Sequence, residues 1–232
     1  MTRRYFVPDL PQNGGVVGLP STEAQHATRV MRVQVGDSII LFDGKGNETK
    51  AIIHQLTRNE CHCDVEPTEP VNREPTRAIH LGIALPKPDR ARELIERLTE
   101  LGVKSVTPLT AERTQRPPSD SLLEKLRRGV IEACKQCGRN ELLHVMPSQS
   151  ATNFFASRDE GIGLIAHVSG ESMTLDVAMK SSIVVAAIGP EGGWTDNEVR
   201  LATDHGFQPI NLGKRIYRIE TAATVIASVM VT

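Results

Sequence analysis

From Arg77 onward, short apolar runs alternate with helical patterns, and this alternation restricts the possible folds more than any other feature of the chain. Continuous apolar runs such as Ile183–Ile188 are typical of parallel strands that are covered on both faces. Strands that alternate with helices predict an α/β domain with a mostly parallel sheet and helices on both faces. The pattern places strands at Ile79–Leu85, Val103–Leu109, Gly163–His167 and Ile183–Ile188, and helices at Asp89–Leu101, Ser121–Cys137, Thr195–Gly206 and Glu220–Met230.

The first 70 residues follow a different pattern, in which short strands are joined by turns. Asp43–Asn47 is typical of a hairpin turn, and it lies between the expected strands Ser38–Phe42 and Glu48–Leu56. A third strand is expected at Glu60–Glu66. These residues predict a small β-barrel.

One short helix is expected between the first strands of this barrel. Ser21 or Thr22 would cap its start, and it would end near Val33. Arg29 and Arg32 would then lie on roughly one side of the helix.

A proline-rich linker follows, with three prolines in the nine residues Pro67–Pro75. Such a stretch marks a domain boundary. The sequence therefore predicts two domains, a β-barrel at residues 1–70 and an α/β domain at residues 76–232.

The net charge of -1 conceals an uneven distribution of charge. Residues 71–140 contain 14 Lys and Arg against 9 Asp and Glu, a surplus of five positive charges, whereas the segments on either side are acidic. A basic segment of this kind is either a surface for anions or nucleic acid, or a solvated helix face. Aromatic residues make up only 3% of the chain, which argues against stacking platforms for single-stranded nucleic acid.

No apolar stretch approaches the roughly 18 residues that are needed to cross a bilayer. No apolar core or cleavage site follows Met1–Tyr5, so the sequence predicts no signal peptide and a cytoplasmic protein.

Four cysteines form two closely spaced pairs, Cys61 with Cys63 and Cys134 with Cys137. These spacings are compatible with a zinc site. Both pairs fall inside expected secondary structure, however, so buried or unused thiols are the favoured interpretation and no metal is expected.

Two glycine loops that follow apolar runs are the clearest candidates for a ligand site. They are Ile188–Trp194 (IGPEGGW) and Leu212–Ala222 (LGKRIYRIETA). Open α/β sheets bind ligands beyond the carboxyl ends of their strands, so the loops are expected to form two walls of one site. Gly192 and Gly193 would leave the backbone open to a flat, adenine-bearing ligand. The alternative is a tight connection that needs positive φ.

Charged side chains accompany the second loop. Arg215 and Arg218 place two fixed positive charges there, and Glu220 or Thr221 could cap the final helix. These side chains would therefore stand beside any ligand bound between the loops.

Two further constellations offer contacts outside the loops. The helix that ends at Gly138 presents Arg139 and Asn140, which are candidates for contacts to anions or bases. His167 stands at the end of an expected strand, where it could reach a ligand.

These motifs together resemble a known family. IGPEGGW and LGKRIYRIETAA are similar to the two cofactor loops of the SPOUT methyltransferases, whose sheet is threaded into a deep C-terminal knot. Adding EACKQCGRN, the ELGV of Glu100–Val103 and HATRVMRVQVGD, the whole chain resembles the RsmE family of bacterial 16S ribosomal RNA uridine N3-methyltransferases.

The resemblance implies a PUA-like, RNA-binding β-barrel followed by a knotted SPOUT methyltransferase domain. It also implies S-adenosylmethionine as methyl donor, 16S ribosomal RNA of the small subunit as substrate, and a homodimer. The cofactor-binding residues that it implies are His167, Ile188, Gly189, Pro190, Glu191, Gly192, Gly193, Leu212, Gly213, Ile216 and Tyr217.

Within this resemblance, the catalytic residues are expected in the second loop. Arg218 would stabilise the negative charge that develops on uridine, and Glu220 would act as a base or a helix cap. N3 lies on the Watson–Crick edge, so the target uridine must be unpaired or extruded. The residues expected to contact the RNA are Arg29, Arg32, Arg139, Asn140 and Arg215.

The chain departs from the family pattern at a few positions that bear on substrate placement. Tyr217 and Ile219 replace an expected leucine and threonine, Arg97 replaces a lysine, and no proline follows His167-Val168. Two alternatives stay open: a non-catalytic RNA-binding factor in ribosome assembly, and a SPOUT methyltransferase that acts on another RNA.

Overall fold

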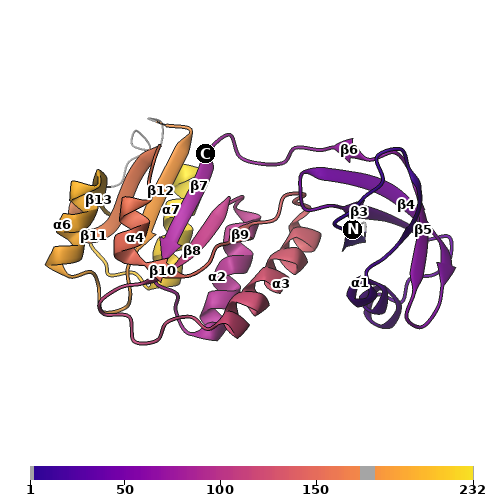
Figure 1. Ribbon diagram of the computed structural model, residues 1–232, viewed down its shortest axis with the longest axis horizontal. Helices are drawn as coiled ribbons and strands as arrows, with labels where there is room; N and C mark the ends of the chain where they lie inside the picture. Colours follow the sequence, from indigo (N-terminus) through magenta and orange to yellow (C-terminus); the bar gives the residue numbers. More distant parts are fainter. Residues whose placement is uncertain (1–2, 173–180, 232) are drawn as a thin grey trace. The chain divides into compact units, whose positions relative to one another are not determined.

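The structure, a computed structural model, describes residues 3–172 and 181–231 (Figure 1). Its contacts divide the chain into two compact units. Unit 1 consists of residues 1–74 and 131–142, and unit 2 of residues 75–130 and 143–232. The helix α3 (Asp120–Cys137) contributes to both units.

Unit 1 is built on a mixed sheet with the strand order β1-β3-β4-β5-β2. The predicted hairpin is confirmed, because the Asp43 carboxylate accepts hydrogen bonds from the backbone N–H groups of Lys45 (2.7 Å) and Asn47 (3.0 Å). One face of the sheet buries an apolar core that includes Tyr5 and Ile53. The strands are β1 (Arg4–Phe6), β2 (Gly15–Gly18), β3 (Ser38–Phe42), β4 (Asn47–Leu56), β5 (Cys61–Val65) and β6 (Glu69–Pro70), which pairs with β4.

The helix of unit 1 differs from the prediction in its cap and its end. α1 (Ser21–Gln25) begins after Pro20, whose carbonyl accepts the first helical hydrogen bond, so neither Ser21 nor Thr22 is the cap. A π-helical turn (His26–Val30) follows. Arg32 lies beyond it with φ of 48°, a left-handed conformation, and therefore does not continue the helix on the side of Arg29.

Unit 2 contains the predicted parallel sheet, with the order β10-β8-β7-β12-β11-β13 and β9 paired to β8. The central strands are buried apolar runs, as expected for a sheet covered on both faces. The strands are β7 (Ala78–Ile83), β8 (Ser105–Thr110), β9 (His144–Val145), β10 (Gln149–Ser150), β11 (Ile162–Ser172), β12 (Ile183–Ile188) and β13 (Phe207–Asn211).

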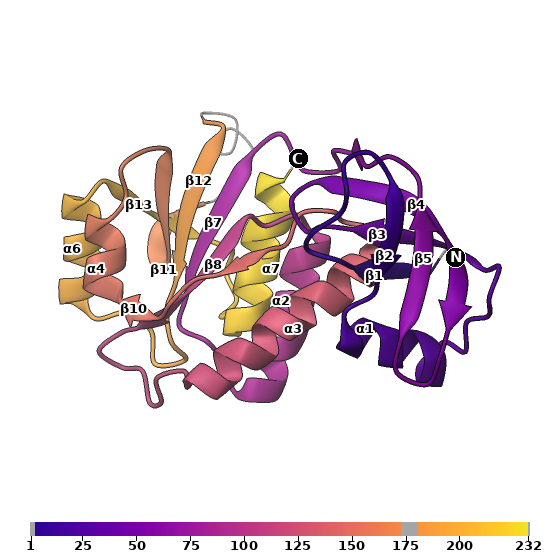
Figure 2. The ribbon, with the colours of Figure 1, turned by 45° about the vertical axis from the view of Figure 1, so that its right-hand side comes forward.

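Helices flank this sheet in two groups (Figures 1 and 2). α7 (Ile219–Met230) contacts β7, β12 and α2 (Pro88–Glu100), whereas α4 (Ala151–Ala156) contacts β8, β10 and α6 (Asp196–Asp204). α6 begins with a capping box, in which Thr195 is the cap and Glu198 is its reciprocal partner. The α/β architecture predicted from the alternating pattern is therefore confirmed.

Two strands, β11 and β13, have irregular features near the carboxyl edge of the sheet. β13 contains Pro209, which an edge strand tolerates because β13 pairs only with β11. In β11, both Ala166 and Glu171 align with Ile210, so the residues between them leave the ladder. This bulge carries His167 away from the regular strand.

Candidate active site

A cavity of about 580 Å³ lies in unit 2 at the carboxyl ends of β11, β12 and β13. Pockets for small molecules measure roughly 300 to 1,000 Å³, so its size suits a cofactor or a nucleotide. All the predicted cofactor-binding residues except Gly192 line it, which brings together loops that are far apart in the sequence. They are His167, Ile188, Gly189, Pro190, Glu191, Gly193, Leu212, Gly213, Ile216 and Tyr217, joined by Arg113, Arg215 and Arg218.

The first loop is a closed turn whose glycines are required by their surroundings. Gly193 has φ of 70°, and its N–H donates to the carbonyl of Pro190 (2.8 Å). A Cβ on Gly189 would stand 2.8 Å from the indole of Trp194. Trp194 in turn packs against Phe155, with ring centroids 5.7 Å apart. A buried aromatic cluster therefore fixes the end of the loop.

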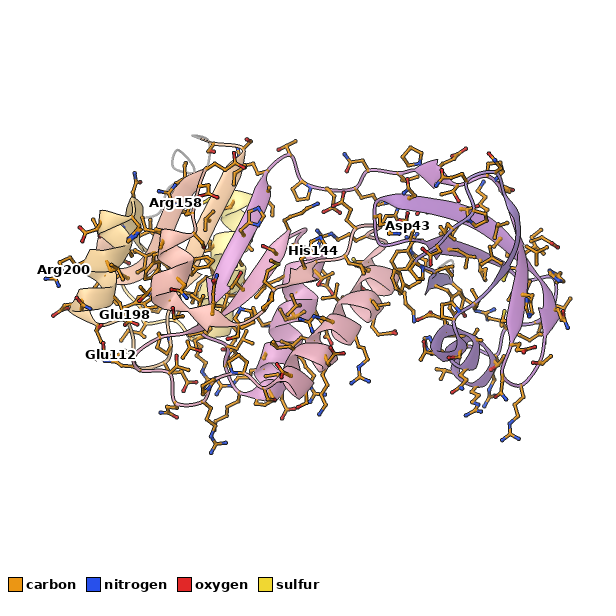
Figure 3. All side chains as sticks on the ribbon, viewed as in Figure 1. Asp43, Glu112, His144, Arg158, Glu198 and Arg200 are labelled. Atoms are coloured by element: carbon orange, nitrogen blue, oxygen red, sulfur yellow. The ribbon has the colours of Figure 1, made fainter. Side chains whose placement is uncertain are left out.

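Arg113, from the segment after β8, lies against this loop. It was not among the residues predicted for the site. Its guanidinium donates to the carbonyl of Gly192 (2.8 Å). The preceding residue is tied down as well, because the N–H of Glu112 donates to Glu198 (2.9 Å), and the two residues lie together in Figure 3. The position of Arg113 just beyond a parallel strand is the signal that could have revealed it.

The second loop presents its side chains outward. Gly213 has φ of 121°, and its N–H donates to the side chain of Asn211 (2.7 Å). Ile216 lines the cavity and is nevertheless 90% exposed. Arg218 is exposed and is the N-cap of α7.

The cap of α7 corrects one expectation. No side-chain hydrogen bond caps this helix, so neither Glu220 nor Thr221 has that role. Glu220 instead lies in the first turn of α7, and its Oε1 is 3.3 Å from Nη1 of Arg90 in α2. Glu220 is not part of the cavity lining, so its role as a base stays a prediction.

Arg90 also reaches the first loop, with its Nη2 3.3 Å from Oε1 of Glu191. No local sequence pattern pointed to this arginine, because its two partners are remote in the sequence. Arg90 connects the first loop to the first turn of α7.

Four of the five residues expected to contact RNA lie in unit 1, where they form two groups, and the fifth, Arg215, is exposed in unit 2. Arg29 and Arg32 are exposed. Arg139 is buried, and its Nε lies 2.9 Å from Oε1 of Glu74. Asn140 is also buried; it donates to the carbonyl of Val71 (3.1 Å) and accepts from Arg4. Arg139 and Asn140 therefore stabilise unit 1 in this structure, whereas Arg29 and Arg32 face solvent.

The four thiols are free and belong to unit 1. Cys61 and Cys63 lie side by side in β5 with their sulfurs 4.0 Å apart, and both are buried. Burial raises the pKa of Cys134 to about 12, whereas Cys137 is exposed. Within residues 3–172 and 181–231, no three His, Cys, Asp or Glu side chains gather in a group that could hold a metal ion. Nor is any helix in the described part long and apolar enough to span a membrane.

Two family models match this chain. Residues 72–231 match the family described as RNA methyltransferase domain, and residues 19–66 match the RNA methyltransferase PUA domain. The fold and the site therefore define an RNA methyltransferase with a PUA domain in its N-terminal part.

Individual relatives show to which family of RNA methyltransferases the chain belongs. Ribosomal RNA small subunit methyltransferase E of Synechocystis sp. is 37% identical, over 90% of this chain and 70% of the relative, and that of Bacillus subtilis is 29% identical, over 95% and 92%. The chain belongs to the family of ribosomal RNA small subunit methyltransferase E, so the predicted resemblance is confirmed.

Two solved structures share the fold over almost the whole chain. Ribosomal RNA small subunit methyltransferase E from Neisseria gonorrhoeae, bound to S-adenosyl methionine, has a TM-score of 0.93 at 30% identity. A methyltransferase structure from Legionella pneumophila, in complex with bound SAM, has a TM-score of 0.92 at 32% identity. Each alignment covers 99% of this chain and 97% of the other.

Proposed function

We propose that this protein transfers the methyl group of S-adenosylmethionine to N3 of a uridine in the 16S ribosomal RNA of the small subunit. The observation that carries the proposal is the cavity in which the two glycine loops and the His167 bulge converge beside Arg215 and Arg218. The names of the relatives and the cofactor bound in two similar structures support the same assignment.

The residues of the cavity fit this cofactor. Ile188, Leu212 and Ala222 supply apolar walls for an adenine ring, and Gly189 and Gly193 leave peptide groups free of side chains. S-adenosylmethionine supplies a methyl group bonded to a positively charged sulfur. The chain's own contribution is then to hold the uridine in line with that methyl group and to exclude competing orientations.

Arg218 is the residue that we assign to the developing charge. Loss of the N3 proton to a base would leave a negative charge on the uracil ring. The N3 electron pair would then form the bond to the methyl carbon while the bond from that carbon to sulfur breaks, with the electron pair of the broken bond staying on sulfur. A fixed guanidinium at the cavity wall stabilises that charge where it develops. Glu220, held by Arg90, would act on the reaction through the position of α7 or as the base.

The RNA contacts are assigned mainly to exposed arginines. Arg29 and Arg32 in unit 1 and Arg215 in unit 2 are exposed and able to contact phosphates. Arg139 and Asn140 would contribute indirectly, through the segment around Glu74 that they hold.

The remaining assignments concern assembly, topology and place in the cell. A homodimer is supported by Val168 and Ile216, apolar residues at the cavity that are 70% and 90% exposed and would gain by burial. The C-terminal knot and the cytoplasmic location follow from the family and from the proposed substrate.

The decisive experiment uses labelled S-adenosylmethionine and small ribosomal subunits from a strain that lacks this methylation. Label mapped to N3 of one 16S uridine is the expected result. RNA binding without transfer would favour a non-catalytic assembly factor. Transfer to a ribose or to transfer RNA would favour a different SPOUT activity.

A further inference from the structure

Arg90 is shared by two carboxylates, one in the first loop of the cavity and one in the first turn of α7. Its Nη2 is 3.3 Å from Oε1 of Glu191 in the first loop, and its Nη1 is 3.3 Å from Oε1 of Glu220 in the first turn of α7. The two ends of one planar guanidinium therefore set the separation of two segments that follow different strands.

The position of Arg90 is explained by these carboxylates and not by its helix. Arg90 is the third residue of α2, and a positive charge near a helix N-terminus is unfavourable. Its side chain is 30% exposed, whereas that of Glu220 is only 13% exposed. The Oε2 of Glu220 is buried without a hydrogen-bond partner among the described residues. Removing Arg90 would thus leave a mostly buried carboxylate uncompensated.

We propose that Arg90 is a positioning residue for methyl transfer, which fixes the first loop against the start of α7. The bridge would hold the cofactor, bound against the first loop, at a set distance from Arg218, the N-cap of α7. This inference rests on the proposed function, because it takes the first loop as a cofactor wall and Arg218 as the contact to uridine. Arg90 itself does not line the cavity.

The test compares Arg90→Met with Arg92→Met in the full-length protein. Arg92 lies on the same helix, is 52% exposed, and pairs only locally with Asp89. Cofactor affinity is measured by calorimetry with S-adenosylmethionine, and the rate by single-turnover transfer to small subunits. Arg90→Met is expected to weaken cofactor binding and to slow transfer, each by about tenfold, because small misplacements of reacting groups are costly. Arg92→Met should stay within about twofold of the wild type.

A double-mutant cycle with Glu191→Gln separates bridging from simple destabilisation. If the bridge is the cause, adding Arg90→Met to Glu191→Gln should cost clearly less than Arg90→Met alone. Fully additive effects, or an Arg90→Met protein that matches Arg92→Met, would overturn the inference. If Arg90→Met does not fold, Arg90→Lys replaces it in the test, because lysine keeps the positive charge but lacks the planar fork of the guanidinium. If the fork is needed, the cofactor affinity of Arg90→Lys should lie between those of the wild type and Glu191→Gln. If the fork is not needed, that affinity should equal the wild-type value.

The proposed function can fail separately. Wild-type protein that binds the cofactor but transfers no methyl group would contradict the proposed activity, while the calorimetric comparison would still decide the role of Arg90.

Discussion

Arg139 grips Glu74 with both Nε, 2.9 Å from Oε1, and Nη2, 2.5 Å from Oε2, although 65 residues separate the two in the sequence. The side chain of Arg139 is 4% exposed and that of Glu74 is 15% exposed. This pair attaches residues 131–142 to the rest of unit 1. Loss of the Arg139–Glu74 pair should therefore lower the stability of unit 1.

Glu74→Gln is expected to lower the free energy of unfolding by about 3 kcal/mol, because it leaves a buried guanidinium without its counter-charge. Denaturant titration measures the change. The matched control is Glu124→Gln, which breaks the exposed pair with Arg127 on α3 and should cost less than about 1 kcal/mol. Equal costs for the two variants would contradict the structural role of Arg139.

Glu48 should make stability depend on acid pH. Burial alone would raise the pKa of its carboxyl, but hydrogen bonds from Arg73 and Arg4 outweigh it and lower the pKa from 4.5 to about 2. Since the folded-state pKa lies below the unfolded one, the stabilisation is present above about pH 5 and is lost as pH falls toward 2. The Glu48→Gln protein should be less stable than the wild type by about 1 to 2 kcal/mol at pH 7, since solvent screens part of the cluster. That difference should shrink in unfolding measurements as pH falls from 5 to 2; a constant difference would show that the charge is not its cause.

Arg218→Ala should slow single-turnover methyl transfer by roughly 10² to 10³-fold at saturating RNA and cofactor, because it removes a fixed charge at the reacting ring. Cofactor affinity, measured by calorimetry, should change little. Lys214→Ala, in the same exposed loop, is the control for lost positive charge. A wild-type rate in Arg218→Ala would remove this residue from the mechanism.

Arg29→Gln and Arg32→Gln should each weaken RNA binding and reduce the slope of log affinity against log salt by about one unit. Filter binding or fluorescence anisotropy over a series of salt concentrations measures both quantities. The wild-type affinity itself should fall steeply with salt. An affinity that does not respond to salt would exclude phosphate contacts as the main source of binding.

Gly189→Ala should impair cofactor binding, since the new Cβ would stand 2.8 Å from the Trp194 indole and force the first loop to shift. The control is Gly129→Ala in α3, where no heavy atom lies within 4 Å of the new Cβ and the helix should gain roughly 0.5 to 1 kcal/mol. Calorimetric titration of both variants with the cofactor compares the two sites. Equal affinities would show that the loop tolerates a side chain at Gly189.

The main features of the α/β domain could be predicted from local sequence patterns. Ile183–Ile188 is a strand with the predicted bounds, and α2 covers Pro88–Glu100 where Asp89–Leu101 was expected. Periodicity and helix stops are properties of neighbouring residues, so one sequence is enough to see them. The start of α1 near Ser21 was predicted, but its cap was wrong, because Pro20 and not a hydroxyl side chain precedes the first turn.

The two glycine loops were also legible in the sequence, because a glycine next to an expected strand signals a conformation or a close approach that other residues cannot supply. The partners of the arginines around these loops could not be predicted from the sequence. In the sequence, Arg90, Arg113 and Arg139 are indistinguishable members of one basic segment, yet the structure gives each a different partner. The sequence by itself therefore determined the main strands and helices of the α/β domain, the character of the two domains and the loops of the site. Only the tertiary structure decided which charges meet, because ion pairs between residues 65 to 130 positions apart depend on how the elements pack and leave no periodic trace in the chain.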